Sequence, residues 1–342
     1  MSKLTWGLLA TGGIAHAFAR GLATSQTGEL LAVGSRTQAA ADHFGEEFSV
    51  PRRYGSYDAL LADPDVQAVY VATPHPLHAE WALRAAQAGK HILCEKPLGM
   101  NEPEARRIIS AAREHDVFLM EAFMYRCHPQ TARLVELLRE GLIGEVRVIQ
   151  ATFSFAGSTD LGGRHLNKAL GGGGILDVGC YCTSMSRLIA GVATGGEIAE
   201  PLEVRGTAHL GPDDGVDEYA VAAARFPGGI LAELATGVTV NQDNVVRIFG
   251  TAGRIDVPSP WFGSRDPGTA RMLVTVYGEP EPREILVASD RGLYTIEADT
   301  VAAHIANRQA AFPAMTWEDT LGNMRMLDMW RESVGLRYDA DS

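Results

Sequence analysis

The sequence predicts a two-domain α/β protein, in which a doubly wound parallel sheet precedes a second domain built on a mostly antiparallel sheet. Three observations support this fold class. The chain has 342 residues, which is longer than a single hydrophobic core usually supports. Up to about residue 125, short apolar runs alternate with helical patterns. After about residue 145 the strand-like runs lengthen, several alternate in polarity, and turn signals such as Pro227-Gly228-Gly229 join them.

In the first half we expect strands at 4–10, 29–35, 68–73 and 91–95, with helices at 14–25, 37–45, 76–89 and 102–115. The last helix has a recognisable start, because Asn101 can cap it, Pro103 lies in its first turn and Glu104 completes a capping box. Near-continuous apolar strands separated by helices predict a parallel sheet covered on both faces.

In the second half we expect strands at 145–155, 202–210, 217–226, 229–238, 244–251 and 270–278, and helices at 174–190, 295–309 and 316–335. We therefore predict one domain over residues 1–125 and a second over residues 126–342, whose C-terminal helix is a candidate to pack back on the first domain.

Composition and charge exclude several classes of function. The formal charge of −12 argues against non-specific nucleic-acid binding, which needs a basic surface. The N-terminus does not read as a secretory signal, and no apolar run approaches a membrane span of about 18 residues. The four cysteines lack zinc-site spacing. We expect free thiols, a cytoplasmic location, no membrane partner and no metal.

The stretch "LLATGGIA" (8–15) follows the first strand and opens a helix, as a dinucleotide-binding turn does. Glycines there let the backbone approach a pyrophosphate that the helix N-terminus then binds. Ala10 and Ala15 replace two glycines of the usual fingerprint, so a turn with only a packing role is the alternative. The expected cofactor contacts are Ala10, Thr11, Gly12, Gly13 and Ile14.

The end of the second strand distinguishes the two nicotinamide cofactors. An NAD site usually has Asp or Glu here for the ribose hydroxyls. This chain has Ser35, Arg36 and Thr37, and a guanidinium with hydroxyls suits a 2′-phosphate. NADP(H) is therefore preferred and NAD(H) is retained as the alternative. A helix cap followed by a solvated arginine would explain the same residues.

The fourth predicted strand ends in "EKPLGMN" (95–101). Either Glu95 and Lys96 are ordinary solvated residues at a strand end, or the segment delivers a lysine to a reaction centre. Other motifs favour the second interpretation: "VATPHPLHAE" (71–80), "MEAFMYRCHPQ" (120–130) and "GGGGILDVGCYCTSM" (171–185).

With the turn at 8–15, this ordered set resembles the glucose–fructose oxidoreductase/inositol dehydrogenase/MocA family, and within it the branch of dimeric dihydrodiol dehydrogenases and D-xylose dehydrogenases. The resemblance runs from residue 4 to residue 338. It implies an N-terminal Rossmann domain and a C-terminal α/β domain with an open, mostly antiparallel sheet. Residues 1–125 would then be the NADP-binding domain, and residues 126–342 the domain for substrate binding and oligomerisation. The departure at Ala10 weakens the argument from the glycine fingerprint alone.

The resemblance also implies residue roles. The loop with Thr73, Pro74, His75 and His78 would line the cofactor. Glu95, Lys96 and Pro97 resemble the family signature, in which the Glu lies near the nicotinamide riboside, the Lys binds substrate and transfers a proton, and the Lys–Pro bond is often cis. Asp177 and Tyr181 would face Lys96 across the cleft.

Hydride transfer at a hydroxyl-bearing carbon needs a group that takes or returns the hydroxyl proton. A lysine has a pKa of about 10.4 in solution, and we expect burial and the cationic nicotinamide to lower that of Lys96 toward roughly 7–8. Tyr181 lies four residues after Asp177 and would share its helix face. Within the family the proton-transfer role passes between lysine and tyrosine, and the sequence leaves this open. Without a catalytic role, Asp177 would be a helix-dipole charge and Tyr181 a core aromatic.

Other residues are weaker candidates. Arg164 and His165 precede the Gly-rich turn and could bind substrate hydroxyls, or lie in a solvated loop. Arg126 is expected at the cofactor or, with His128, in interdomain packing. Trp261 and Phe262 could form an apolar wall over a sugar ring.

The sequence thus predicts an NAD(P)-dependent oxidoreductase acting on a sugar, polyol or related cyclic compound. Two rivals are a glycosidase-type elimination with a recycled cofactor and a non-catalytic cofactor-binding regulator. The regulator should have lost Lys96, Asp177 or Tyr181, and all three are present. We expect a homodimer or homotetramer formed through the C-terminal sheet, with strands 202–238 facing a second subunit.

Overall fold

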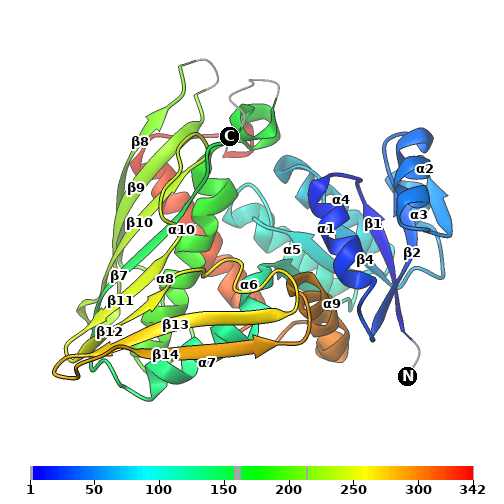
Figure 1. Cartoon of the computed structure of the whole chain (residues 1–342). Coiled ribbons are helices and arrows are strands. Elements are labelled where there is room, and N and C mark those ends of the chain that lie inside the picture. The colour runs from blue at the N-terminus through cyan, green and yellow to red at the C-terminus, as the bar shows by residue number, and fades with distance from the viewer. Residues whose placement is uncertain (1–2, 158–162, 213–214, 342) are drawn as a thin grey trace.

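The structure is a computed structural model, and it describes residues 3–157, 163–212 and 215–341. Two sheets organise it (Figure 1). The first is parallel and has the strand order β3-β2-β1-β4-β5-β6. Its strands are β1 (Leu4–Leu9), β2 (Gly28–Gly34), β3 (Arg52–Tyr54), β4 (Ala68–Val71), β5 (His91–Glu95) and β6 (Leu119–Ala122). This order is that of a Rossmann fold, as predicted.

Helices cover both faces of this sheet: α1 (Gly13–Leu22), α2 (Gln38–Glu47), α3 (Tyr57–Leu61), α4 (His78–Gln87) and α5 (Glu102–Glu114). The central strands are mostly apolar because both faces of the sheet are covered; β4 is buried at all four positions, whereas the edge strand β3 is half-buried and polar. The start of α5 differs in one detail from the expected capping box. Asn101 accepts the N–H of Glu104 as predicted, but the Glu104 carboxylate accepts the N–H of Met100 instead of that of Asn101.

The second sheet has eight strands in the order β14-β13-β12-β11-β7-β10-β9-β8. Its strands are β7 (Val146–Ser154), β8 (Glu203–Leu210), β9 (Asp217–Arg225), β10 (Leu231–Gly237), β11 (Val246–Gly250), β12 (Gly253–Val257), β13 (Gly268–Val276) and β14 (Arg283–Ser289). Only β7 and β10 pair in parallel; every other pairing is antiparallel. The predicted mostly antiparallel sheet is confirmed, although β12 and β14 were not expected.

The remaining helices are α6 (Met124–Cys127), α7 (Pro129–Arg139), α8 (Cys180–Ala193), α9 (Leu293–His304) and α10 (Trp317–Ser333). One π-helical turn, Ile175–Gly179, precedes α8, where a regular helix was expected. Helices α8 and α10 pack on one face of the second sheet, and Figure 1 shows no helix on the opposite face.

The chain returns to the first sheet after β14. Helix α9 packs against α1, and α10 packs against α5. Trp317 Nε1 donates to the Leu119 carbonyl of β6 at 3.0 Å, and the hydroxyls of Thr24 and Thr295 lie 2.8 Å apart. The C-terminal helix therefore does pack back on the first half. A division of the chain near residue 125 stays a prediction.

Within the described ranges, no helix combines the length and apolar character needed to cross a membrane.

Candidate active site

A cavity of about 1040 Å³ lies where the carboxyl ends of β1, β2, β4 and β5 face the second half of the chain. This edge of a doubly wound sheet is the usual ligand site. Most of the predicted site residues line the cavity: Ala10, Thr11, Gly12, Gly13, Ile14, Ser35, Arg36, Thr73, Pro74, His75, His78, Glu95, Lys96, Arg164, His165, Asp177 and Tyr181.

The cofactor end of the cavity is formed by the first βα turn. Gly12 is the N-cap of α1 and brings no side-chain cap, so the amides of the first turn are left without side-chain partners. Ala10 takes a φ of +94°, a conformation that favours glycine, so the alanine follows the backbone course that a glycine would take. Ser35 and Arg36 line the cavity from the end of β2.

A nicotinamide dinucleotide fits these residues. A Cβ placed on Gly12 or Gly13 would meet nothing within 4 Å, so both glycines present bare backbone to open space. The Thr73 hydroxyl is buried and has no hydrogen-bond partner among the described residues, although it lines the same cavity. Buried hydroxyls are normally satisfied, so an unsatisfied one marks a place for a ligand or a water.

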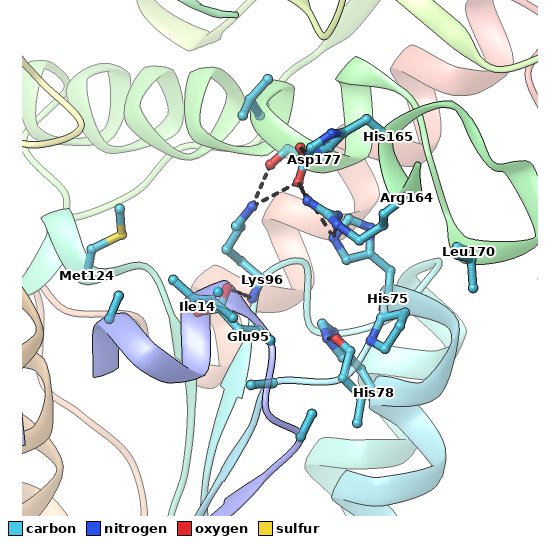
Figure 2. Close-up of a pocket in the computed structure, with 18 of the residues that line it drawn as sticks. Ile14, His75, His78, Glu95, Lys96, Met124, Arg164, His165, Leu170 and Asp177 are labelled. Atoms are coloured by element: carbon cyan, nitrogen blue, oxygen red, sulfur yellow. Dashed lines mark hydrogen bonds and ion pairs between the residues drawn. The ribbon is translucent and has the colours of Figure 1, made fainter. Parts of the chain in front are cut away.

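Lys96 meets Asp177 at the other end of the cavity (Figure 2). Lys96 Nζ donates to the Asp177 carbonyl at 2.7 Å and lies 3.3 Å from its Oδ1. Arg164 Nη2 lies 3.1 Å from the same Oδ1. Burial alone would raise the pKa of Asp177, but Lys96 and Arg164 outweigh it and hold that pKa far below its usual value.

The pKa of Lys96 is a correction to the sequence prediction. Burial is the largest single effect on it and lowers it, but Asp177, Cys180 and Glu95 together raise it by more, so the net pKa is above the ordinary value. The expected fall toward neutrality is therefore wrong for the protein by itself. The prediction had weighed burial and the cationic nicotinamide, and had not counted the charge of the carboxylate that the fold places beside the amine.

Tyr181 lies beside Lys96, as its motif suggested. Lys96 Nζ is 5.2 Å from the centroid of the Tyr181 ring, a cation–π distance. The Tyr181 hydroxyl donates to Met124 Sδ at 3.3 Å. Burial, and then the acidic Glu95, raise the pKa of Tyr181 well above its ordinary value. Asp177, in the π-helical turn, and Tyr181, in α8, both line the cavity, as their four-residue spacing predicted.

The two predicted histidines connect loops. The ring nitrogens of His78 lie 2.8 Å from the carbonyls of Thr73 and Pro97, so neither is free to meet a cofactor. Burial lowers the pKa of His78 to about 4, and a neutral ring donates to one of these carbonyls only. His75 Nδ1 lies 3.0 Å from the Gly171 carbonyl, which joins the first half of the chain to the Gly-rich turn. The Lys96–Pro97 bond is cis, as the resemblance implied.

Three predicted cofactor contacts do not line the cavity. Arg126 is fully buried elsewhere, where its guanidinium donates to the Pro313 carbonyl and to the Asp319 carboxylate, both at 2.6 Å. We therefore remove Arg126 from the cofactor contacts. Thr37 instead caps α2, accepting the Ala40 N–H at 3.3 Å. Pro97 contributes the carbonyl near His78.

An aromatic wall completes the cavity on the side of the second sheet. Phe153, Phe155 and Phe262 line it, and Trp261 lies behind, stacked on Phe153 with 5.6 Å between ring centroids. The sequence had pointed to Trp261 and Phe262. Phe153 and Phe155 were not predicted as site residues, although their alternate spacing at the end of the strand expected over 145–155 places both on one face. Tyr57, Asn244, Arg265 and Tyr294 also line the cavity, and nothing in their local sequence marks them.

Among the described residues, no group of three or more His, Cys, Asp or Glu side chains is placed to hold a metal ion.

Comparison with known proteins identifies the family to which the chain belongs. Residues 4–123 match the family model described as the Gfo/Idh/MocA oxidoreductase family with an NAD-binding Rossmann fold, and residues 131–256 match the Gfo/Idh/MocA C-terminal domain. The chain belongs to the Gfo/Idh/MocA family. The motifs had predicted this family and its class of activity, an NAD(P)-linked oxidoreductase, and both are confirmed.

Similar members of the Gfo/Idh/MocA family include enzymes for diols and sugars. The chain is 34% identical over 346 residues to trans-1,2-dihydrobenzene-1,2-diol dehydrogenase from Danio rerio, covering 99% of each chain. It is 32% identical over 334 residues to D-xylose 1-dehydrogenase (NADP(+)) 2 from Haloferax volcanii, covering 97% of each.

Solved structures agree with this assignment. The 3-ketoreductase KijD10 from Actinomadura kijaniata, in complex with NADP and TDP-benzene, has a TM-score of 0.86 and 27% identity, covering 97% of this chain and 98% of that one. The aldose–aldose oxidoreductase from Caulobacter crescentus, complexed with glycerol, has a TM-score of 0.85 and 26% identity, covering 98% of each chain.

Proposed function

We propose that this protein is an NADP-dependent oxidoreductase that acts on a secondary hydroxyl, or the matching ketone, of a cyclic sugar, polyol or dihydrodiol. The observation that carries the proposal is one continuous cavity. It runs from the glycine turn and Arg36, past Lys96 and Asp177, to an aromatic wall. The diol and sugar dehydrogenases among the relatives support the substrate class.

The cofactor would be held by the first half of the chain. The free amides at the start of α1 suit the pyrophosphate, because a helix N-terminus attracts negative charge. Arg36 and Ser35 suit a 2′-phosphate through charge-assisted hydrogen bonds, and Arg36 is the reason to prefer NADP(H) over NAD(H). When bound, the nicotinamide supplies the hydride acceptor or donor.

Lys96 would hold and move the proton at the reacting oxygen. Because the pKa of Lys96 is raised, the amine is an ammonium at neutral pH and suits proton donation to an oxygen that becomes negative during reduction. Asp177 and Arg164 flank the same position and would hold neighbouring hydroxyls. Tyr181 places its ring against the amine, and its phenol is the second candidate for the acid–base pair.

The test of this mechanism is Lys96→Met, which removes the ammonium and keeps the length of the side chain. NADPH binding, followed by nucleotide fluorescence, should remain within about twofold, whereas turnover should fall by about 10²–10⁴-fold. Lys90→Met is the matched control, because Lys90 is also buried but donates to the Asp63 and Val66 carbonyls outside the cavity. Normal turnover in the Lys96→Met variant would contradict the proposed mechanism.

A panel of sugars, inositols and dihydrodiols assayed by NADPH absorbance would identify the substrate class. Phe153, Phe155 and Phe262 line the cavity, and aromatic rings pack well against the apolar face of another ring. Cyclic substrates should therefore be turned over faster than open-chain polyols of equal hydroxyl count. Release of a glycosidic leaving group without net NADPH change would instead indicate the elimination reaction.

The bare face of the second sheet supports a homo-oligomer. Tyr219 and Val221 of β9 and Leu231 of β10 are 44%, 49% and 50% exposed on this face. Monomers seldom leave such an apolar sheet face in water. We also retain the cytoplasmic location as a proposal, which four free cysteines support.

A further inference from the structure

The Gly-rich turn Gly171–Gly174 wraps around a buried carboxylate, and the oxidoreductase mechanism does not use either feature. The carboxylate belongs to Asp217, the first residue of β9, which is fully buried. Asp217 Oδ2 accepts the N–H of Ile175 at 2.6 Å, and the N–H of Gly174 also hydrogen-bonds to this carboxylate. Ile175 is the first residue of the π-helical turn that carries Asp177.

The close fit explains why glycine is needed at this turn. Gly173 has a φ of +109°, which side-chain-bearing residues rarely adopt, and a Cβ there would collide with Asp217 Oδ1. Two further bonds fix the same segment from other elements. The Thr236 hydroxyl of β10 donates to the Gly174 carbonyl at 3.0 Å, and the Tyr338 hydroxyl donates to the Gly172 carbonyl at 2.5 Å.

The position of this turn decides where Lys96 finds its partner. Asp177 lies two residues after Ile175, and it holds Lys96 through a backbone carbonyl as well as through its carboxylate. A side-chain carboxylate could follow a displaced backbone by changing its rotamer, but a backbone carbonyl cannot. A shift of the turn would therefore pull the carbonyl away from the amine.

We propose that Asp217 is a positioning residue, which fixes the turn Ile175–Gly179 so that Asp177 holds Lys96 in place for proton transfer. Asp217 itself does not line the cavity and acts only through the backbone of Gly174 and Ile175. The catalytic part of this inference rests on the proposed function. The geometric part, that Asp217 controls the surroundings of the Lys96 amine, does not.

The experiment compares Asp217→Ala, Asp217→Asn and Gly173→Ala with the wild-type chain. The alanine variant removes both acceptors, the asparagine variant keeps the shape and one acceptor oxygen, and Gly173→Ala disturbs the contact from the opposite side. Asp63→Ala is the control, because Asp63 is likewise a buried carboxylate that accepts a backbone N–H, that of Asp65 at 3.0 Å, but it lies outside the cavity.

The first readout needs no turnover: the rate at which a small amine-reactive reagent labels Lys96 at pH 9, followed by peptide mass spectrometry. In the wild-type chain Asp177 keeps the amine protonated. In Asp217→Ala and Gly173→Ala the pKa of the Lys96 amine should fall. Labelling should then be about 3–10-fold faster, since one pKa unit is a tenfold change in the amount of free amine. Asp217→Asn should stay close to wild type, and Gly173→Ala decides the question if Asp217→Ala does not fold.

The second readout separates chemistry from binding. The turnover number of Asp217→Ala should fall at least about tenfold, because small misplacement of a reacting group is costly, while NADPH affinity stays within about twofold. Asp63→Ala should lose stability without either change. Unaltered Lys96 labelling in folded Asp217→Ala and Gly173→Ala would overturn the proposal. If the wild-type chain shows no turnover on any substrate, the proposed function fails, and the labelling result still decides the role of Asp217.

Discussion

Asp177 is the residue on which the charges of the site converge. Lys96 and Arg164 lie within 3.3 Å of its Oδ1, and His75 and His165 lie within 3.8 Å of its carboxylate. A buried carboxylate stays ionised only with such partners. The Asp177 carboxylate, with Cys180 and Glu95, also keeps the pKa of Lys96 above its ordinary value although burial lowers it.

At the residue scale, Arg36 should determine the choice of cofactor. Arg36→Ala should weaken NADP binding by about 10²-fold, because charge-assisted hydrogen bonds to a phosphate contribute about 1.5–3 kcal/mol. NAD binding should change little, since NAD carries no 2′-phosphate. Titrating both nucleotides against Arg36→Ala and against the control Arg20→Ala, an exposed change on α1, would measure this. Equal losses for NAD and NADP would show that Arg36 does not contact the phosphate.

Glu121 gives a prediction about pH. It is buried in β6 and accepts the Leu98 N–H at 2.9 Å, next to the segment that carries Lys96. Burial raises the pKa of Glu121 to about 7, against about 4.5 in an unfolded chain. Between these values the folded state keeps a proton that the unfolded state releases. The free energy of unfolding should therefore fall with rising pH, by about 3 kcal/mol from this group.

Glu121→Gln should remove this contribution to the decrease in unfolding free energy with rising pH. Urea unfolding at pH 5 and at pH 7.5 would show it, with the exposed Glu114→Gln as control. Identical pH dependence in Glu121→Gln and wild type would contradict the assignment of this titration to Glu121.

At the scale of elements, the return of α9 to the first half brings distant segments into one site. Tyr294 of α9 lines the cavity and packs against α1 at Gly21, where an added Cβ would lie 2.6 Å from Tyr294 Cβ and 3.0 Å from the Thr295 nitrogen. The two helices can approach this closely only because residue 21 has no side chain.

Gly21→Ala should therefore separate α9 from α1. We expect a loss of about 1–3 kcal/mol in unfolding free energy, the usual cost of overpacking, seen as a lower Tm. Gly45→Ala in α2 is the control, because its added methyl would meet only the long side chain of Arg53, which can move. There the better helix propensity of alanine should leave stability equal or higher. A Gly21 variant as stable as Gly45→Ala would show that the helices can separate at no cost.

At the scale of the whole molecule, the second sheet has two different faces. Helices α8 and α10 cover the inner face, whereas the outer face carries Tyr219, Val221 and Leu231 (Figure 1). Charged residues between them, such as Arg205 and Glu233, give that face the mixed character of a subunit interface.

Val221→Asp should shift the assembly toward monomers, because burying an unpaired carboxylate at an interface is strongly unfavourable. Light scattering at micromolar concentration would measure the mass, with the exposed Ala39→Asp of α2 as control. A wild-type chain that is monomeric under these conditions would contradict the proposed oligomer.

The local sequence was sufficient for many of the elements and for the motifs at their ends. Apolar periodicity predicted β1, β2, β4 and β5 and the helices that follow them, because a strand buried on both faces has little room for polar residues, whereas β3, α3 and β6 were not predicted. The turn at 8–15, Ser35-Arg36 and Glu95-Lys96 could be placed because each follows a strand, and parallel strands deliver their carboxyl ends to one edge.

The tertiary structure decided how the charges act on one another. The family resemblance had placed Asp177 across the cleft from Lys96, but only the fold brings these residues, 81 apart in the chain, into contact, where Asp177 makes the largest contribution that raises the lysine pKa. Arg126 looked like a cofactor contact in its motif, but its partner, Asp319, lies 193 residues away in α10. Electrostatic effects depend on distance in space and on burial, and neither can be read from the residues adjacent in sequence.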